Sequence, residues 1–219
     1  MENIEKKKNK NNYKVISQQV IKRLPRYYRF LGELLDEETH RISSGEFAKR
    51  MGLTASQVRQ DLNCFGGFGV QGYGYNVEIL RQEIAHIIGL EKSSKVIVIG
   101  AGKIGQAICD GMGFERRGCE LIGVFDIDSK LHGKSVAGHK IKSMEELSGF
   151  CKGNQPKIAV LCIPKKAAVE ACEELIELGV KNFLNFSHFD IKLHHKDVNV
   201  ENVHLGDSLL TLLYKANHS

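Results

Sequence analysis

The sequence contains no tryptophan, only three prolines and few aromatic residues, which make up 7% of its 219 residues. Its longest apolar runs, such as residues 96–99, fall far short of the roughly 20 residues that a membrane-spanning helix needs. The polar first residues carry no sign of a secretory signal. We therefore expect a cytoplasmic protein with no membrane partner.

Cysteine patterns typical of metal sites are also missing. The six cysteines form no Cys-x-x-Cys pair and no Cys–His cluster with the spacing of zinc ligands, so we expect no metal site. Several, such as Cys162, stand in apolar runs, which favours buried small side chains in a reducing compartment. A direct thiol redox switch is the alternative interpretation.

Hydrophobic residues make up 42% of the chain and charged residues 26%, which is enough to build a globular core. The net charge of +5 is concentrated in the first half, where residues 1–89 hold 14 Lys and Arg against 10 Asp and Glu. Residues 13–30 contain no acid, and their cations are Lys14, Lys22, Arg23, Arg26 and Arg29. This stripe favours a polyanionic partner, and a solvated helix face is the alternative. Residues 1–15 are predicted to be a disordered basic arm.

Residues 16–89 carry the pattern of a DNA-binding domain. Ser17 is a candidate N-cap, and Pro25 is expected to separate a short first helix from a second one. Ser43 or Ser44 can then cap a helix that ends at Gly52, and Thr54 can cap the next. Two short helices joined by a tight turn predict a helix-turn-helix.

Glycines alternate with aromatic and β-branched residues over residues 65–77. This alternation predicts a β-hairpin with its turn near Gln71 and Gly72. A hairpin after a helix-turn-helix makes a winged helix, and residues 78–88 are predicted to form one more helix.

Residues 90–205 alternate between short apolar runs and amphipathic segments. Strands are expected at 95–99, 120–126, 157–163 and 182–186, and helices at 103–113, 143–150 and 166–178. Continuous apolar strands between helices predict a doubly wound parallel sheet of the Rossmann type, so the fold class is α/β. A final apolar helix within residues 206–219 is expected to pack on its own domain or on another subunit.

A glycine-rich motif, Gly-x-Gly-x-x-Gly, spans residues 100–105 between a predicted strand and a predicted helix. Its glycines allow a tight turn, close approach to a pyrophosphate and close packing of helix on strand. Asp126 follows Gly105 by 21 positions, where an acid is expected to bind the ribose hydroxyl of NAD and to repel the 2′-phosphate of NADP. The sequence therefore predicts binding of NADH and NAD+.

Two further segments end predicted strands at the same edge of the sheet. One contains Ile163 and Pro164, and the other runs from Asn185 to Phe189. The histidine within it, His188, is interpreted as a hydrogen-bonded or solvated loop residue, since a lone histidine rarely marks a general base.

Several of these residues occur together in one known family. They include Leu24-Pro-Arg-Tyr-Tyr-Arg29, Arg41-Ile-Ser-Ser44, Gln57-Val-Arg-Gln-Asp-Leu62, Phe65-Gly-x-Phe-Gly69, Gly72-Tyr-Gly-Tyr75, Phe125-Asp-Ile-Asp128 and Gly179-x-Lys-x-Phe-Leu-Asn185. From about residue 16 to the end, the chain resembles the Rex redox-sensing transcriptional repressors. The resemblance implies a homodimer of winged-helix and Rossmann domains with a swapped C-terminal helix. Such a protein binds operator DNA when NADH is low, and NADH competes with NAD+ and releases the DNA.

The resemblance also assigns site residues, with residues 54–63 as the recognition helix. The implied DNA contacts are Arg26, Tyr28, Arg29, Ser43, Ser44, Thr54, Ser56, Gln57, Arg59, Gln60, Gln71, Gly72 and Tyr73. The implied cofactor contacts are Gly100, Ala101, Gly102, Lys103, Ile104, Gly105, Asp126, Ile127, Asp128, Ile163, Pro164, Phe186 and Ser187.

The chain departs from many relatives at four positions. It has Gln60 where they carry Lys, and Gln71 near where they carry a basic residue. It also has Gly111 and His204 near the positions where they carry a Tyr and an Asp that pair in the redox switch.

Two other functions compete with a repressor. A small NAD-dependent oxidoreductase is the main alternative, but the sequence shows no Tyr-x-x-x-Lys motif and no convincing His–acid pair, so we expect no catalytic residues and no enzyme activity. The third possibility is a DNA-binding protein whose Rossmann domain only dimerises.

Overall fold

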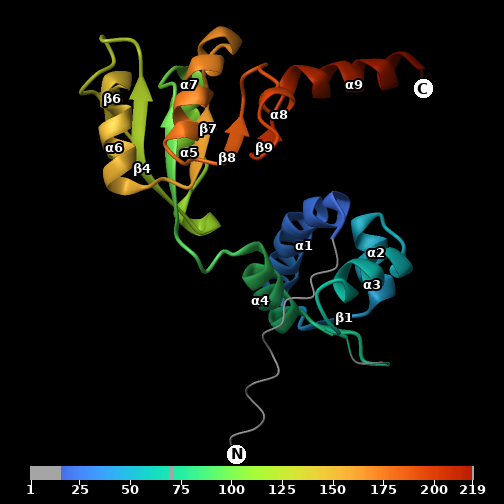
Figure 1. Cartoon of the computed structure of the whole chain (residues 1–219). Helices are drawn as coiled ribbons and strands as arrows, with labels where there is room; N and C mark the ends of the chain where they lie inside the picture. Colours follow the sequence, from blue (N-terminus) through green and yellow to red (C-terminus); the bar gives the residue numbers. More distant parts are fainter. Residues whose placement is uncertain (1–15, 70–71, 219) are drawn as a thin grey trace, which may run out of the picture. The chain divides into compact units, whose positions relative to one another are not determined.

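The computed structural model describes residues 16–69 and 72–218 (Figure 1). The basic arm expected at residues 1–15 and the wing residue Gln71 lie outside the described residues. The chain divides into two compact units, one reaching to Glu91 and the other starting at Lys92. Each unit has its own core and is described by itself.

The first unit begins with one long helix, α1 (Gln18–Asp36), where the sequence predicted two. Ser17 is the N-cap as predicted, but Pro25 lies inside the helix and does not end it. A proline removes one backbone hydrogen bond from a helix. The apolar face continues across Pro25, since Leu24 and Tyr27 are both buried in the same core, and this packing holds the two parts in one helix.

The predicted helix-turn-helix is confirmed. Helix α2 (Ser44–Met51) is capped by Ser43, and helix α3 (Ala55–Asn63) is capped by Thr54. Gly52 turns the chain between them in the left-handed conformation, with a φ of 67°. Helix α4 (Val77–Ile88) follows and packs on α1.

The predicted hairpin is wrong in the part of residues 65–77 that the structure describes. Strand β2 (Tyr75–Asn76) pairs antiparallel with β1 (Arg41–Ile42), which precedes α2, and residues 65–69 form no strand. Glycine is a poor strand former, and Gly66 has a φ of 140°. The Tyr75 side chain is buried, so core packing brings this segment against β1.

The second unit is built on one twisted sheet with helices alongside it (Figure 1). Its strands are β3 (Ser94–Ile99), β4 (Cys119–Asp126), β5 (Ser135–Val136), β6 (His139–Ser143), β7 (Ile158–Leu161), β8 (Asn182–Asn185) and β9 (Asn199–Asn202). Its helices are α5 (Lys103–Gly111), α6 (Leu147–Asn154), α7 (Lys165–Glu177), α8 (Ile191–His194) and α9 (Leu205–His218), with 3-10 turns at Glu115–Arg117 and Met144–Glu146.

The strand order confirms the predicted Rossmann-type sheet. The order is β5-β6-β4-β3-β7-β8-β9, and all neighbours are parallel except the short edge pair β5–β6. Without β5, this is the order 3-2-1-4-5-6 of dinucleotide-binding folds. Strands that follow β3 in the sequence are added first on one side of it and then on the other. The C-terminal end of β3 therefore lies at the position where such folds bind ligands.

Helices cover both faces of the sheet. Ile97 and Ile99 of β3 point into a core shared with α6 and α7. Val96 and Val98, which alternate with them, point into a second core with Cys109 of α5. This alternation explains why the strand is apolar at every position, as expected for a strand buried on both faces.

Sequence patterns missed the β5–β6 hairpin, α8 and β9. Strand β9 is mostly exposed and polar, so it lacks the apolar signal of a strand. Side-chain amides fix it to β8 instead: Asn199 Nδ2 donates to Asn182 Oδ1 at 2.9 Å, and Asn185 Nδ2 donates to Asn202 Oδ1 at 2.8 Å. Both pairs are register partners in the parallel ladder.

The predicted C-terminal helix is α9, and its apolar side chains are all exposed within the single chain. Their exposed fractions run from 52% to 71% at Leu205, Leu209, Leu210, Leu212, Leu213 and Tyr214. Among the described helices, none has the length and hydropathy of a membrane span.

Three of the six cysteines bear out the prediction of buried side chains. Cys109, Cys151 and Cys172 are buried, Cys119 and Cys162 are half-buried, and Cys64 is exposed. All six are free thiols.

Candidate functional site

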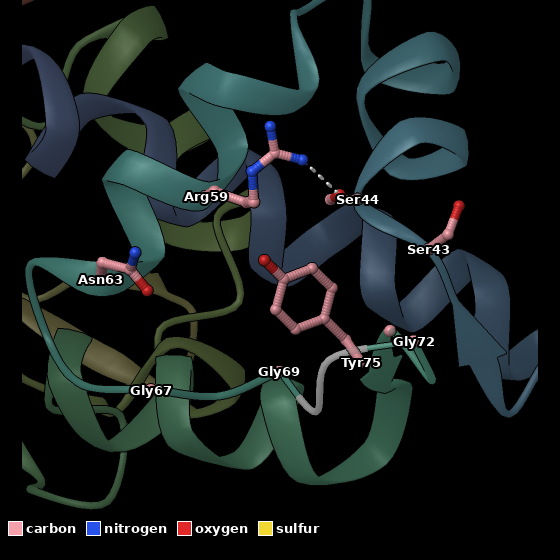
Figure 2. A pocket seen from close by; sticks show the side chains of 9 residues that line it. Ser43, Ser44, Arg59, Asn63, Gly67, Gly69, Gly72 and Tyr75 are labelled. Carbon is pink, nitrogen blue, oxygen red and sulfur yellow. Dashed lines mark hydrogen bonds between the residues drawn. The ribbon is translucent and has the colours of Figure 1, made fainter.

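A hollow of about 470 Å³ opens on the helix-turn-helix unit (Figure 2). Side chains and glycines from α2, α3 and the following glycine-rich segment line it. They are Ser43, Ser44, Arg59, Asn63, Gly67, Gly69, Gly72, Gly74 and Tyr75. The hollow thus lies where the start of α2, the exposed side of α3 and the segment before β2 meet.

Arg59 and Tyr75 give this hollow its polar character. Arg59 Nη1 donates to Ser44 Oγ at 2.9 Å, and the Tyr75 hydroxyl points toward the same guanidinium in Figure 2. Burial raises the pKa of Tyr75, and the nearby Arg59 charge opposes that rise only in part. At neutral pH the hollow therefore offers a cation and neutral hydroxyl groups, which suit a phosphate oxygen.

Several predicted DNA-contact residues lie at or beside this hollow. Ser43, Ser44, Arg59 and Gly72 line it. The α3 residues Ser56 and Gln60 are exposed, and Gln57 is half-buried. The hydroxyl of Thr54 accepts from the Gln57 backbone N–H at 3.1 Å, so it caps the helix.

The predicted contacts on α1 also have partners within the protein. Arg26 Nη2 donates to the Met51 carbonyl at 2.8 Å. The exposed Arg29 guanidinium lies 3.9 Å from Glu33. The Tyr28 hydroxyl accepts from Arg81 Nη2 at 2.9 Å. None of these three predicted contacts lines the hollow within the described residues.

Tyr73 is a different case, since 70% of it is exposed. The Arg41 guanidinium lies over its ring, 5.9 Å from the centroid.

The implied DNA contacts did not include Asn63, Gly69, Gly74 or Tyr75, although Asn63 belongs to the expected recognition helix and Gly74 to the expected wing. Gly74 has a φ of 69°, and a Cβ there would collide with the Ile42 carbonyl. A Cβ on Gly69 would come within 2.9 Å of the Tyr75 ring. The alternation of glycine with tyrosine was visible in the sequence, but only the β1–β2 pairing shows which backbone each glycine approaches.

In the second unit, the glycine-rich loop connects β3 to α5. Gly100 has a φ of 97°, and a Cβ there would lie 2.6 Å from the Cys162 carbonyl. A Cβ on Gly105 would collide with the Gly100 carbonyl, so the predicted close packing of helix on strand is present. Gly102, by contrast, faces open space.

The start of α5 is suited to bind an anion. Gly102 is its N-cap residue and supplies no side-chain cap, while Lys103 and Ile104 in the first turn are exposed. The first backbone N–H groups of a helix point outward and carry the positive end of the helix dipole. A pyrophosphate therefore fits beside Gly102, where a side chain would take its space.

Asp126 lies at the end of β4, next to this loop. Its Oδ2 accepts from the Ala101 N–H at 2.6 Å, and its Oδ1 accepts from the Asp128 N–H at 2.8 Å. His132 Nε2 lies 2.8 Å from the Asp126 carbonyl and fixes the loop further. Each carboxylate oxygen keeps a second lone pair, so Asp126 can also accept from ribose hydroxyl groups. Ile127 beside it is 86% exposed.

The other predicted cofactor residues lie at the C-terminal ends of β7 and β8. Ile163 is half-buried, and Pro164 precedes α7. Phe186 is half-buried, whereas Ser187 is buried with its hydroxyl 2.6 Å from Asn185 Oδ1.

His204 lies beside this segment at the start of α9. Its Nε2 is 3.0 Å from the Ser187 carbonyl, and its ring contacts the His188 ring at a tilt of 36°, with 5.0 Å between the centroids. The sequence did not identify this pairing or the role of His132, because both depend on loop conformation.

Family models match both units. One described as "Putative DNA-binding protein N-terminus" matches residues 15–63, and one described as "CoA binding domain" matches residues 91–189. The helix-turn-helix and the Rossmann-type sheet thus define the class: a DNA-binding unit joined to a nucleotide-binding fold.

Full-length relatives are more specific. The chain is 47% identical over 206 residues to the redox-sensing transcriptional repressor Rex of Clostridium perfringens (strain SM101 / Type A), which covers 94% of this chain and 97% of that protein. It is 49% identical over 203 residues to the protein of the same name from Caldanaerobacter subterraneus subsp. tengcongensis, covering 93% and 90%. A crystal structure of RSP with beta-NAD+ and operator DNA matches with a TM-score of 0.88, at 47% identity and 94% coverage of both chains. RSP with beta-NADH matches with a TM-score of 0.85, at 44% identity, covering 94% of this chain and 96% of that one. The chain belongs to the Rex family of redox-sensing transcriptional repressors.

Proposed function

We propose that this protein is a repressor that binds operator DNA as a homodimer and releases it when NADH binds. The observation that carries the proposal is the presence of two sites on one chain: a polar hollow beside a helix-turn-helix and an open glycine loop beside an acid. The likeness to RSP, which was solved with operator DNA and with either form of the cofactor, supports the same pairing of ligands.

On the DNA side, we infer that α3 enters the major groove. The amides of the half-buried Gln57 and the exposed Gln60 can each pair with an adenine edge. Arg59, Ser43 and Ser44 would contact phosphates and fix the register of the protein on the duplex. Arg26 and Tyr28 also have intramolecular partners, as Arg59 and Ser44 do, and they stay proposed DNA contacts.

On the cofactor side, the N–H groups at the start of α5 would hold the pyrophosphate and Asp126 the adenosine ribose. The acid favours NAD over NADP, because the 2′-phosphate of NADP would meet a second negative charge. The nicotinamide cofactor would act here as a ligand that reports redox state. The exposed side chains of Ile104 and Ile127 would cover apolar parts of the ligand.

Coupling between the sites requires two arrangements of the dimer. NADH must bind the arrangement that cannot hold DNA more tightly than the one that can, since a ligand without such a preference shifts no equilibrium. The exposed apolar face of α9 is the surface that we assign to dimerisation, with the helix swapped onto the partner. Such a dimer would act in the cytoplasm, where both DNA and NADH are present in bacteria.

We test the proposal by fluorescence anisotropy at fixed salt. The probe is the duplex that the unmodified protein selects from a random-sequence pool, titrated with NADH, NAD+ and NADPH. We expect NADH to release the duplex and NADPH to have little effect. An affinity that stays constant at saturating NADH would contradict the proposal. Consumption of NADH in the presence of small carbonyl compounds would instead favour an oxidoreductase.

A further inference from the structure

A buried carboxylate lies on the inner side of the recognition helix α3. Asp61 is 3% exposed, and three hydrogen bonds reach it from α1. Arg23 Nε donates to Asp61 Oδ2 at 2.6 Å, and Arg23 Nη2 donates to Oδ1 at 2.8 Å. The Tyr27 hydroxyl donates to Oδ2 at 2.6 Å. All three bonds join residues that are 34 or 38 positions apart in the sequence.

The two side chains that bind Asp61 are Arg23 and Tyr27, and both keep a fixed protonation state. Tyr27 is fully buried and its ring packs edge-on against Phe47 of α2, with 5.3 Å between the centroids. Burial and the Asp61 hydrogen bond raise the pKa of the Tyr27 hydroxyl well above its usual range, so it stays a donor. The Asp61 hydrogen bond raises the pKa of Arg23, which stays a cation. The carboxylate therefore meets donors whose protonation does not change near neutral pH.

Apolar packing alone would fix the rotation of α3 about its own axis only weakly. The helix has nine residues, and only Val58 and Leu62 among its apolar side chains are fully buried. Hydrophobic contact is non-directional, so a narrow apolar face constrains the rotation of a short helix about its axis less than directional bonds do. A bidentate pair with an arginine is directional, because two parallel N–H···O bonds fix the plane of the carboxylate.

Helix α1 also holds the other helix of the motif. Arg26 is one turn along from Arg23, and its guanidinium donates to the carbonyl of Met51, the last residue of α2. A cation there satisfies a free carbonyl and interacts favourably with the helix dipole. Two arginines of the cationic stripe seen in the sequence, Arg23 and Arg26, thus help to set the positions of α3 and α2.

We propose that Asp61 is a positioning residue for DNA recognition: held by Arg23 and Tyr27, it fixes the rotation of α3 and so the bases that its exposed side chains reach. This inference rests on the proposed function, because it gives α3 the role of the recognition helix. It adds a residue that contacts no DNA and yet determines specificity. A small rotation of α3 would move Gln57 and Gln60 out of reach of their base edges while phosphate contacts from α2 remain.

The test compares variants of the full-length protein. Asp61→Asn keeps the size of the side chain but loses its charge and places an N–H₂ group against donors. Tyr27→Phe removes one bond of the three. The control is Glu37→Gln, since Glu37 also pairs with an arginine, Arg50 at 2.9 Å, but at an exposed site. Two duplexes are used: the one selected from a random pool by the unmodified protein, and a scrambled one of equal composition.

The decisive quantity is the ratio of affinities for the selected and scrambled duplexes, corrected for the active fraction by stoichiometric titration. We expect Asp61→Asn to lower this ratio about tenfold, the scale of one lost base contact, and Tyr27→Phe to lower it less. Glu37→Gln should leave it within about twofold, because exposed pairs contribute little.

A purely structural role would give a different result. Asp61→Asn would then lower the melting temperature or the active fraction while the folded fraction kept the wild-type ratio, and that outcome overturns the proposal. If Asp61→Asn does not fold, the ratio for Tyr27→Phe decides, since a wild-type ratio there also overturns it. Failure of the unmodified protein to select any duplex would instead count against the proposed function.

Discussion

At the scale of single residues, two glycines of the glycine-rich loop have different roles: one allows close packing and the other leaves space for a ligand. Gly105 has the Gly100 carbonyl against it, whereas Gly102 faces open space and has a φ of −70° that any residue adopts. We expect Gly105→Ala to destabilise the fold by about 1–3 kcal/mol, because overpacking moves the backbone. Gly102→Ala should leave the melting temperature unchanged and abolish binding of NADH.

Two measurements on each variant check this prediction: thermal unfolding without ligand and a fluorescence titration with NADH. Equal NADH affinity in Gly102→Ala and the unmodified protein would show that the pyrophosphate does not approach this glycine.

The cysteines allow a second prediction at this scale. Burial raises the pKa of Cys109 and Cys151 to about 11, and that of Cys162 and Cys172 to about 12. The thiolate is the reactive form, so these thiols should react slowly with DTNB at pH 8 in the native protein. The exposed Cys64 should react quickly. Cys64→Ser should remove the fast phase, and a fast phase that persists would mean that a buried thiol is accessible.

The sequence shows which residues carry charge or form a motif, but it does not show which distant residues they contact. The glycine motif and Asp126 follow from spacing alone, because a strand–loop–helix unit fixes their geometry locally. The arginines of α1 show the limit: the sequence shows their charge, but the partners Asp61 and Met51 lie 25 or more residues away along the chain. A cation with a partner inside the fold looks the same in a sequence as one that awaits a phosphate.

At the scale of elements, helix α9 has a strongly apolar side without cover in the single chain. Leu209 is 66% exposed, and we expect it to lie in the dimer interface. Leu209→Lys should shift the protein from dimer to monomer in sedimentation velocity, because a charge in an apolar interface lacks a partner. Ser208→Lys, on the polar side of the same helix, is the control and should stay dimeric.

The errors in predicted elements arose because tertiary contacts outweighed the local sequence signals. Pro25 and the glycines of residues 65–69 are strong local signals, yet tertiary packing decided the outcome at α1 and β2. Conversely, the polar strand β9 gave almost no local signal and forms through amide pairs with β8. Elements with a continuous apolar pattern, such as β3, were predictable because their burial and their propensity agree.

At the scale of the whole molecule, buried thiols link stability to alkaline pH. Their pKa values of about 11 to 12 in the folded protein exceed the ordinary value of about 8.5. Above that value the unfolded chain releases protons that the folded chain keeps, so the free energy of unfolding falls as the pH rises. Below pH 8 these thiols should contribute no pH dependence. We expect urea unfolding to show a loss between pH 8 and pH 10.5.

The loss should approach about 1.4 kcal/mol per thiol for each pH unit above the unfolded pKa, as long as the folded thiol stays protonated. Cys172→Ala should reduce the loss. Stability that is flat up to pH 10.5 would mean that the thiols are more accessible to water than the structure indicates.

The overall architecture was the most predictable level. Alternation of apolar runs and amphipathic segments indicates a parallel sheet covered on both faces, and the strand order follows from the rules of such folds. The short antiparallel pair β5–β6 was not predictable, because its partner strand β6 carries lysines and a histidine in place of an apolar run.

The asparagine pairs between β8 and β9 determine where the C-terminal helix starts. A shift of β9 by one residue would break both amide pairs at once. The register of β9 is therefore fixed although the strand has few apolar side chains. The position at which the last helix leaves the sheet is therefore the same in every copy of the chain. Two copies that exchange these helices would each place the helix at the same position.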